Sequence, residues 1–509
     1  MTSAADPAGP SARPGSHADP HADPHPRARL DVGLLVAGLG LLLLVGASGT
    51  SVALPPLGPH GWAPPSLPWQ LTPWTVVALQ TLGYLLGAAS LWRHVRRPVP
   101  LRLRWWHVAG LAVLVLLTAP FGTADHTNYA AYGRILVEGG DPWTVVPSQW
   151  RGDADPVVRW VQDPWREATS VYGPVGTWLM GLSAQVGGEL ARQVVWVWQA
   201  LVVGAWLGVR ELLVRLGTDR PTVDRWWTTN VLVVGAGVLG AHVDTLAVCA
   251  MAAALGLGLA GRPLLAGLAT GLAASTKLTA GVVGVALLWG WLGTSPRPRR
   301  WAEVARLVVG TLIVLVPAHA FVGRAALTRI GEAGSGISYA MPWRSVYTLL
   351  DLGLDEGVAR SVTTWVAAIG CVLLAVALWR ITDGLTEVVA VRALFVLTTA
   401  YSLGAGYVLP WYELPQWLAT AVLVGLVGHE GWRRLRPLLL LLVARSLVLA
   451  LAYVPGRVHL PEDVETVTLA VRFVASPLAT LTVWVAIWVL CRQARQSRVR
   501  GWSGRGQRI

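Results

Sequence analysis

The sequence is poor in lysine, cysteine and charge. It holds 41 lysines and arginines, yet Lys277 is the only lysine among its 509 residues. Charged residues make up 14% of the chain, against roughly 25% in a soluble domain, which excludes an ordinary soluble globular protein. The three cysteines, Cys249, Cys371 and Cys491, lie in or at the end of apolar runs. They therefore provide neither a disulfide framework nor a metal-binding spacing.

Long apolar runs stand where charge is missing. Runs of about 20 residues, the length that spans a bilayer, recur from Asp31 to Arg492. They predict an all-α, polytopic transmembrane helical protein, with about 12–14 spans. The net charge of +13 comes from arginines clustered in short loops. This pattern is typical of cytoplasmic loops in multi-pass proteins, so we expect membrane lipids as partners and no nucleic acid.

Loop charge also predicts which side each connection faces. Four arginine-rich segments are assigned to the cytoplasm: 93–104, 297–300, 433–436 and 492–508. Residues 123–190 hold eight acids and four arginines, and we assign them to a large first outer loop that carries interfacial helices. Counting spans from these segments places five polar segments, from distant parts of the chain, at the same outer surface. This shared position predicts one site assembled from all of them.

The ends of the chain differ from its middle. Residues 1–30 are rich in proline, alanine and histidine, which predicts a disordered cytoplasmic tail. Residues 31–491 are expected to form one transmembrane domain, and 492–509 a basic cytoplasmic tail. The histidines of the first tail recur every four residues, but we favour a solvated tail over a metal site. The first apolar run is interpreted as an uncleaved span.

The first polar segment, TADHTNYAAYGRILVEGGDPW at 123–143, follows directly after a span. If it is helical, Asp125, Asn128, Tyr129 and Tyr132 share one face. A carboxylate beside hydroxyl groups at a membrane boundary suits a general base that acts on a sugar hydroxyl. The alternative is that Asp125 caps the helix N-terminus. Further along the same loop, two Asp-Pro-Trp triplets predict turns, and the apolar stretch 170–188 predicts a helix lying against the outer face.

Two further segments combine charge with small or hydroxyl side chains. His242 and Asp244 stand at the expected start of a helix, where they either orient a phosphate or acceptor, or Asp244 acts as an N-cap. Lys277 lies between apolar runs and is flanked by Ser275, Thr276 and Thr279. A cation with hydroxyls at a helix end suits a phosphate. The alternative is a lysine that extends to the membrane interface.

The last two segments are aromatic. Arg344 lies among Tyr339, Trp343 and Tyr347 in an outer loop, and its planar guanidinium suits phosphate binding. Trp411 and Tyr412 occupy a proline-containing turn between spans, where they would contact sugar or lipid. In both cases an interfacial aromatic belt is the alternative.

These segments, in this order, resemble the polytopic glycosyltransferases of the C superfamily (GT-C). The closest likeness is to the actinobacterial polyprenol-phosphomannose-dependent α-1,6-mannosyltransferases of lipomannan assembly. The motifs that carry the resemblance are D-x-x-x-Y-x-x-x-G (Asp125, Tyr129, Gly133), G-x-D-P-W (Gly139–Trp143), Y-G-P (Tyr172–Pro174), A-H-x-D (Ala241–Asp244), K-L (Lys277, Leu278) and L-P-W-Y (Leu409–Tyr412).

The resemblance implies a cell-envelope glycosyltransferase with its active site on the outer, periplasmic side. The donor would be polyprenyl-phosphate mannose, the acceptor a lipid-linked mannan or lipoglycan, and the transfer inverting. The implied roles are Asp125 as general base, Lys277, Arg344 and His242 at the donor phosphate, and Tyr129, Asp244, Trp411 and Tyr412 at sugar, acceptor or lipid. Many members of the superfamily pair two acids in the motif of the base.

Here Ala124 and His126 flank Asp125, so we expect chemistry without a metal or another cofactor. Two other functions stay open from the sequence. One is a lipid or polysaccharide flippase or transporter, because ionisable residues in membranes also mark transport pathways. The other is a scaffold in envelope assembly.

Overall fold

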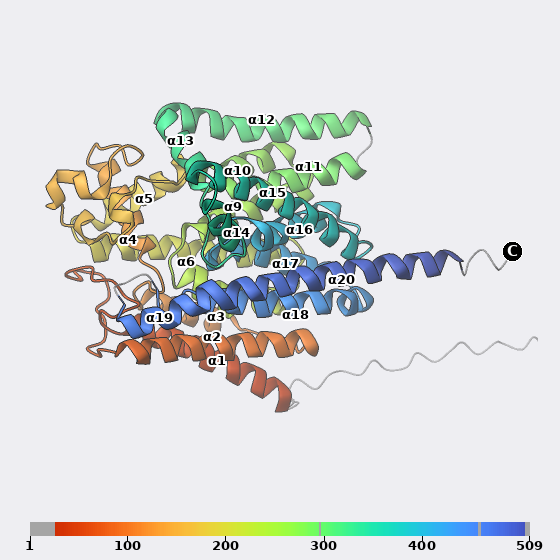
Figure 1. Ribbon diagram of the computed structural model, residues 1–509, viewed down its shortest axis with the longest axis horizontal. Helices are drawn as coiled ribbons and strands as arrows, with labels where there is room; N and C mark the ends of the chain where they lie inside the picture. The colour runs from red at the N-terminus through yellow and green to blue at the C-terminus, as the bar shows by residue number, and fades with distance from the viewer. Residues whose placement is uncertain (1–25, 295–296, 457–459, 504–509) are drawn as a thin grey trace, which may run out of the picture.

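The computed structural model describes residues 26–294, 297–456 and 460–503, and within these ranges it contains helices and no strand. Long helices lie side by side along the longest axis of the molecule, and short helices and irregular loops gather at one end (Figure 1). Of the two expected tails, residues 1–25 and 504–509 lie outside the described residues. Residues 26–30 begin the first helix, and 492–503 continue the last one.

Six of the described helices are long and apolar enough to cross a bilayer. They are α1 (Pro26–Ala47), α2 (Pro73–Arg96), α6 (Ala191–Arg215), α12 (Arg297–Val322), α15 (Glu356–Ile381) and the continuous pair α19 (Glu462–Ala470) and α20 (Ser476–Ser503). A seventh span results if Val231–Val238 and α9 (Val243–Leu259), which bend by 120° at their junction, count as one. The expectation of an all-α, polytopic membrane protein is confirmed.

Among the described residues, fewer helices reach the length of a full span than the 12–14 spans expected, because several apolar segments form short helices. These are α3 (Trp105–Leu116), α10 (Pro263–Thr276), α11 (Val282–Thr294), α16 (Val389–Gly404) and α17 (Leu414–Leu426). A helix of 14 residues is about 21 Å long, whereas the hydrocarbon core of a bilayer is about 30 Å thick. The polar chain breaks at the ends of these helices can therefore line an internal cavity.

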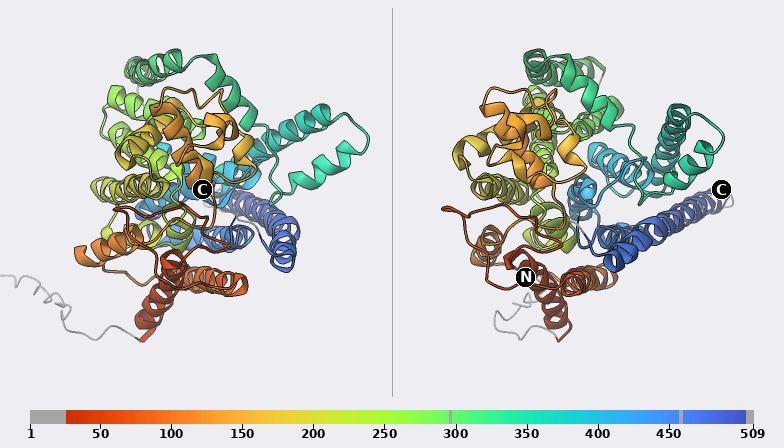
Figure 2. Two further views of the ribbon diagram at one scale, coloured as in Figure 1. Left: turned by 90° about the vertical axis from the view of Figure 1, so that its left-hand side faces the viewer. Right: turned by 60° about the vertical axis from the view of Figure 1, so that its left-hand side comes forward.

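The remaining helices complete the bundle and its cap. They are α4 (Asp125–Val137), α5 (Pro174–Gly187), α7 (Arg220–Val223), α8 (Val231–Val233), α13 (Arg324–Ala333), α14 (Trp343–Asp351) and α18 (His429–Leu451). The helix expected within 170–188 is therefore present as α5. Helices α4 and α5, with the loop between them, cover one end of the bundle, and Figure 2 shows this cap from its outer side.

The two ends of the bundle differ in charge as the loop pattern predicts. The end of α2, the start of α12 and the end of α20 carry the arginine-rich segments and lie at the end opposite α4 and α5 (Figure 1). Asp31 near the start of α1 bonds Arg93 near the end of α2 at 2.5 Å, which places these two helix ends together. The acidic loop and the basic segments are thus separated by the length of the bundle.

Close helix packing depends on small residues where α10 crosses α12. A Cβ added at Gly267 would lie 2.2 Å from the Leu307 carbonyl oxygen, and one at Gly310 would lie 2.3 Å from the Leu264 carbonyl oxygen. Both distances are far below van der Waals contact, so the two backbones touch only because glycine has no side chain. This close approach is the usual way in which membrane helices associate.

We expect Gly267→Ala to destabilise the protein by about 1–3 kcal/mol, because the added methyl forces α10 and α12 apart. Gly204→Ala is the matched control. Gly204 lies inside α6, and a Cβ there would have no atom within 4 Å, so the variant should be neutral or up to ~1 kcal/mol more stable. Thermal unfolding in detergent, followed by size-exclusion chromatography, measures both. Equal midpoints for the two variants would contradict the packing described.

Candidate active site

A cavity of about 410 Å³ opens at the end of the bundle that α4 and α5 cover. Its volume lies within the range of small-molecule sites. The wall combines charged and aromatic side chains from distant parts of the chain. They are Asp125, Trp165, Tyr172, Asp244, Lys277, Glu332, Arg360, Tyr401, Tyr407, Trp411 and Tyr412. Five of the eight residues selected from the sequence are in this set, so the structure brings most of them together.

Asp125 is the first residue of α4, at the entrance of the outer loop. The N-cap of α4 is Ala124, and no side chain caps the helix, so the capping alternative for Asp125 is not realised. The residue is 4% exposed, and its backbone N–H donates to the Thr123 hydroxyl at 3.1 Å. One carboxylate oxygen lies 3.7 Å from Nδ1 of His242. The expected helix thus exists and places Asp125 at the cavity.

His242 lies behind the wall of the cavity rather than on it. It precedes α9, and its ring stacks on Trp411 with centroids 3.6 Å apart and planes 11° from parallel. The hydroxyl of Tyr129, four residues after Asp125 on α4, lies 3.3 Å from Nδ1 of His242. Both side chains are buried, and neither lines the cavity. They are placed to orient Asp125 and Trp411.

Lys277 and Asp244 form an ion pair in the cavity wall. Lys277 directly follows α10, and its ammonium donates to Oδ1 of Asp244 at 2.6 Å. The same ammonium lies 3.4 Å from the centre of the Tyr412 ring, within the range of a cation–π contact. The N-cap of α9 is His242, so Asp244 is not the cap that the sequence allows. Its Oδ2 is buried and has no hydrogen-bond partner among the described residues.

The Tyr-Gly-Pro motif docks the outer loop onto the segment before Lys277. A Cβ at Gly173 would lie 2.1 Å from the carbonyl oxygen of Ser275, so glycine permits direct backbone contact. The N–H of Val175 donates to the Ser275 hydroxyl at 3.4 Å. Tyr172 then packs edge-on against Tyr129 with ring centroids 5.3 Å apart. This docking holds the loop that carries Asp125 beside the end of α10.

A buried ion pair holds the turn that carries Trp411 and Tyr412. Glu413, the last residue of this 3₁₀ turn, pairs with Arg445 of α18, and both side chains are buried. Arg445 also donates to the carbonyl oxygen of Ser402 in α16 at 2.9 Å. Neither this pairing nor the role of Arg445 was recognised in the sequence, because Arg445 stands alone in an apolar run.

Arg344 does not reach the cavity. Its guanidinium lies over the rings of Tyr339, at 4.3 Å, and of Tyr347, at 5.1 Å, outside the residues that line the wall. The arginine in the wall is Arg360, in the second turn of α15, which bonds Glu356 at 2.7 Å. Sequence reasoning missed Arg360 because a Glu–Arg pair four residues apart is typical of an exposed helix surface.

The predicted turns of the outer loop are present, and one of them contributes to the wall. The N–H of Trp143 donates to Oδ1 of Asp141 at 2.9 Å, and the Trp143 indole donates to the Tyr172 carbonyl oxygen at 2.9 Å. Trp165, from the second Asp-Pro-Trp triplet, lines the cavity. The two tryptophans therefore have different positions: Trp143 supports the loop, and Trp165 faces the cavity.

Asp155 joins the outer loop to α4. One of its oxygens accepts the N–H groups of Val157 and Val158 at 2.9 and 3.1 Å, and the other accepts Nε of Arg134 on α4 at 3.1 Å. Burial, the largest influence, raises the pKa of the Asp155 carboxyl. The hydrogen bonds and the charge of Arg134 outweigh burial, so the pKa lies below its ordinary value of 3.8.

Known proteins match this chain over much of its length. A family model described as alpha-(1->6)-mannopyranosyltransferase, N-terminal domain, matches residues 34–293. The chain is 29% identical over 267 residues to alpha-(1->6)-mannopyranosyltransferase A of Mycobacterium tuberculosis (strain ATCC 25618 / H37Rv), a match that covers 51% of this chain and 50% of that protein.

A second relative is a probable alpha-(1->6)-mannopyranosyltransferase of Mycolicibacterium smegmatis (strain ATCC 700084 / mc(2)155). It is 25% identical over 346 residues, which are 66% of this chain and 54% of that protein. The chain spans about half the length of the curated relatives that it matches. The residues matched by the family model include Asp125, Asp244 and Lys277, whereas Trp411 and Tyr412 lie beyond them.

The network around Asp155 predicts how the outer loop responds to acid. Because the folded-state pKa is below the unfolded value, the stabilisation is complete above about pH 4 and is lost as the pH falls through the folded pKa. The protection of the backbone amides of residues 141–170 against hydrogen exchange should therefore fall sharply on acidification below that pH. In the Asp155→Ala variant, this protection should already be lost at pH 6.

Glu189→Ala is the control for Asp155→Ala. Glu189 contacts the same Arg134 at 3.7 Å but is 79% exposed, and exposed pairs of this kind contribute about 0–1 kcal/mol. Its exchange at pH 6 should match that of the unmodified protein. A loop that stays protected at pH 6 in Asp155→Ala would refute the role given to Asp155.

Proposed function

The chain belongs to the alpha-(1->6)-mannopyranosyltransferase family, and from this premise we propose that it transfers a mannosyl residue from polyprenyl-phosphate mannose to a mannan or lipoglycan acceptor. The observation that carries the proposal is the single cavity in which Asp125 lies with the Lys277–Asp244 pair. The cavity opens at the end opposite the arginine-rich segments, which supports a site on the outer, periplasmic face of the plasma membrane.

The reaction needs a base, and the surroundings of the two carboxylates favour Asp125. Asp244 is bonded to the Lys277 ammonium at 2.6 Å, so one of its carboxylate oxygens already accepts a fixed donor. Asp125 instead faces His242, which is 3.7 Å away. Asp125 takes the proton of the acceptor hydroxyl while that oxygen attacks C1 of the mannosyl group. The C1–O bond to phosphate breaks, and the polyprenyl phosphate leaves with the bonding electrons.

Positive charge in the wall supports departure of the phosphate. A lysine ammonium has three N–H donors, and one of those of Lys277 is used by Asp244, which leaves donors for a phosphate oxygen. Arg360 supplies a second cation in the same wall and fills the role first assigned to Arg344. Preorganised cations stabilise the charge that collects on the leaving phosphate, so the proposal uses these two side chains in place of a metal ion.

A smaller, mostly apolar cavity could bind the lipid part of the donor. It has a volume of about 110 Å³ and shares Asp244, Lys277 and Tyr412 with the main cavity. Val248 of α9, Val282 of α11 and Leu397 of α16 form part of its wall. An isoprenoid chain entering between these helices would leave its phosphate beside Lys277. The sugar would then lie against Trp411 and Tyr412, whose faces suit a pyranose ring.

The proposed reaction gives an inverted product. In one-step displacement the acceptor oxygen attacks C1 from the face opposite the leaving phosphate. A β-linked donor then yields the α-linkage that names the family. His242 acts through Asp125 in this scheme, because it lies 3.7 Å from that carboxylate and stacks on Trp411. Tyr129 acts through His242, because its hydroxyl lies 3.3 Å from Nδ1 of that ring. Neither side chain lines the cavity.

We expect Asp125→Asn to fold normally and to lose about 10²–10⁴-fold in transfer rate, because the amide cannot accept the acceptor proton. The measurement uses purified protein with radiolabelled polyprenyl-phosphate mannose and a mannan acceptor, and counts new glycosidic product. Asp141→Asn is the control: it removes a charge from the same loop but keeps an oxygen for the Trp143 N–H, and its rate should be unchanged.

Full activity of Asp125→Asn would remove Asp125 from the base position. Movement of intact lipid across the membrane, without any glycosidic product from the unmodified protein, would instead support the transporter function considered from the sequence.

A second prediction separates the structural and chemical parts of the Lys277–Asp244 pair. Lys277→Met leaves the Asp244 carboxylate buried without its cation, which should cost about 3–5 kcal/mol of stability. Adding Asp244→Asn removes that charge, so the double variant should recover most of the stability. It should still lack activity, because the donor phosphate has lost its ammonium. A double variant that regains both stability and transfer would restrict Lys277 to a structural role.

A further inference from the structure

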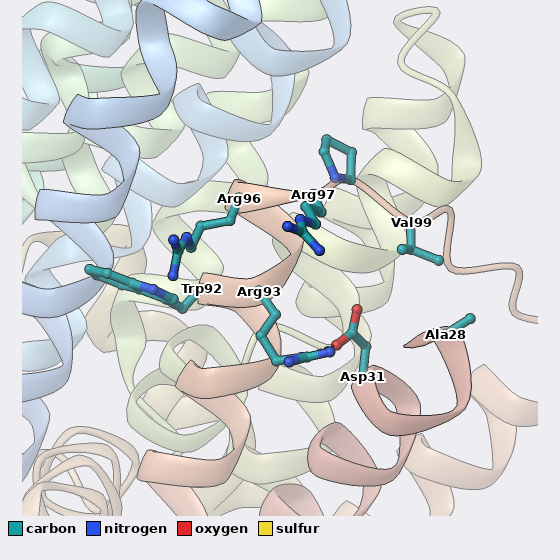
Figure 3. Close-up of a pocket in the computed structure, with 8 residues that line it drawn as sticks. Ala28, Asp31, Trp92, Arg93, Arg96, Arg97 and Val99 are labelled. Atoms are coloured by element: carbon teal, nitrogen blue, oxygen red, sulfur yellow. Dashed lines mark hydrogen bonds and ion pairs between the residues drawn. The ribbon is translucent and has the colours of Figure 1, made fainter. Parts of the chain in front are cut away.

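A second cleft lies at the basic end of the molecule, far from the proposed catalytic cavity. It has a volume of about 600 Å³ and lies between the start of α1 and the end of α2 (Figure 3). The residues that line it are Ala28, Asp31, Trp92, Arg93, Arg96, Arg97, Pro98 and Val99. The proposed function makes no use of this cleft.

The cleft has an excess of positive charge. Arg93 is held by Asp31 at 2.5 Å, and Figure 3 shows its guanidinium directed toward that carboxylate. Arg96 and Arg97 are exposed. Their side chains have no ion-pair or hydrogen-bond partner in the part of the chain that the structure describes. Figure 3 shows Arg96 extending back toward Trp92. Because neither guanidinium has a partner among the described residues, both arginines remain available to an anion.

The walls of the cleft are built into the fold. Asp31 is buried, and its carbonyl oxygen accepts the hydroxyl of Ser90 at 2.7 Å. Beyond the end of α2, the N–H of Val99 donates to Nδ1 of the buried His94 at 3.4 Å. These bonds fix both sides of the opening around Arg97. The cleft is therefore formed by the packing of α1 and α2 and does not depend on a ligand.

Trp92 joins this cleft to an apolar groove. The groove has a volume of about 460 Å³ and lies between α18 and α20. Apart from Trp92, it is lined by Pro437, Leu440, Leu441, Ala444, Ala486, Val489, Leu490 and Gln493. A basic cleft and an apolar groove that meet at one tryptophan match the two parts of a membrane lipid, because tryptophan prefers the level between headgroups and acyl chains.

We infer that an anionic phospholipid binds here, with its phosphate at Arg96 and Arg97 and an acyl chain in the groove between α18 and α20. Three arginines against one carboxylate favour an anionic headgroup over a zwitterionic one, and arginine binds phosphate through a planar pair of donors. The lipid would belong to the leaflet at the basic end of the bundle. It would connect the α1–α2 hairpin to the last two long helices. This inference does not depend on the transferase activity.

Native mass spectrometry of the delipidated, purified chain tests the inference. Phosphatidylglycerol should bind more tightly than phosphatidylcholine with the same acyl chains. The double variant Arg96→Gln, Arg97→Gln should weaken phosphatidylglycerol binding by about 30-fold, because each basic side chain near an anionic lipid contributes a factor of roughly five. Ala444→Phe, which fills the groove, should also weaken it.

The matched control is the double variant Arg102→Gln, Arg104→Gln. It removes the same charge from the same basic segment, but these side chains do not line the cleft, so affinity should be unchanged. An equal loss of phosphatidylglycerol affinity in the control variant would overturn the inference. So would binding of phosphatidylcholine to the unmodified chain as tight as that of phosphatidylglycerol. Either result would indicate a positively charged surface without a specific site. Glycerol phosphate that binds as tightly as the lipid, with no effect of Ala444→Phe, would identify a soluble phosphate ester as the ligand instead.

Discussion

The ion pair between Lys277 and Asp244 is the constraint on which the cavity depends. Burying an ammonium is costly unless it is paired, and the carboxylate at 2.6 Å and the face of Tyr412 offset that cost. Each of the three groups comes from a break in the helical structure. Asp244 follows a bend of 120°, Lys277 separates α10 from α11, and Tyr412 lies in a 3₁₀ turn. Three chain breaks must therefore coincide in space, and the space left between them is the cavity.

The proposed base enters this arrangement from outside the bundle. Asp125 is carried by α4, which packs with α5 as a cap, and the cap is held to the bundle by the backbone contact of Gly173 with Ser275. The cation and the base thus belong to different structural units that meet at the cavity. Under the proposed function, this cap would admit an acceptor from the aqueous side while the lipid donor enters between helices, so the two substrates would not share a path.

The sequence predicts the site residues that lie at breaks between apolar runs. It does not predict which side chains line the cavity and which lie behind its wall. Asp125, Asp244, Lys277, Trp411 and Tyr412 all interrupt apolar runs, and loop charge places those interruptions on one face; the structure brings all five to one wall. Spacing cannot reveal that the ring of His242 lies behind that of Trp411. Nor can it show that α14 turns Arg344 onto Tyr339 and Tyr347 while the seemingly exposed Arg360 faces the cavity. Composition identifies apolar runs, but it does not show that several of them form helices of 12–16 residues, as the structure does.

Positive charge has different physical consequences at the two ends of the molecule. In the cavity, Lys277 is desolvated, so it requires a fixed partner and the surrounding chain is arranged to provide one. At the basic end, Arg96 and Arg97 reach solvent, so they can remain unpaired at little cost, and topology alone would explain their presence. Topology does not require a preformed cleft, nor a tryptophan shared with an apolar groove. Orienting the chain in the membrane and binding the inferred lipid are compatible roles for this segment, because both need the arginines at the headgroup level.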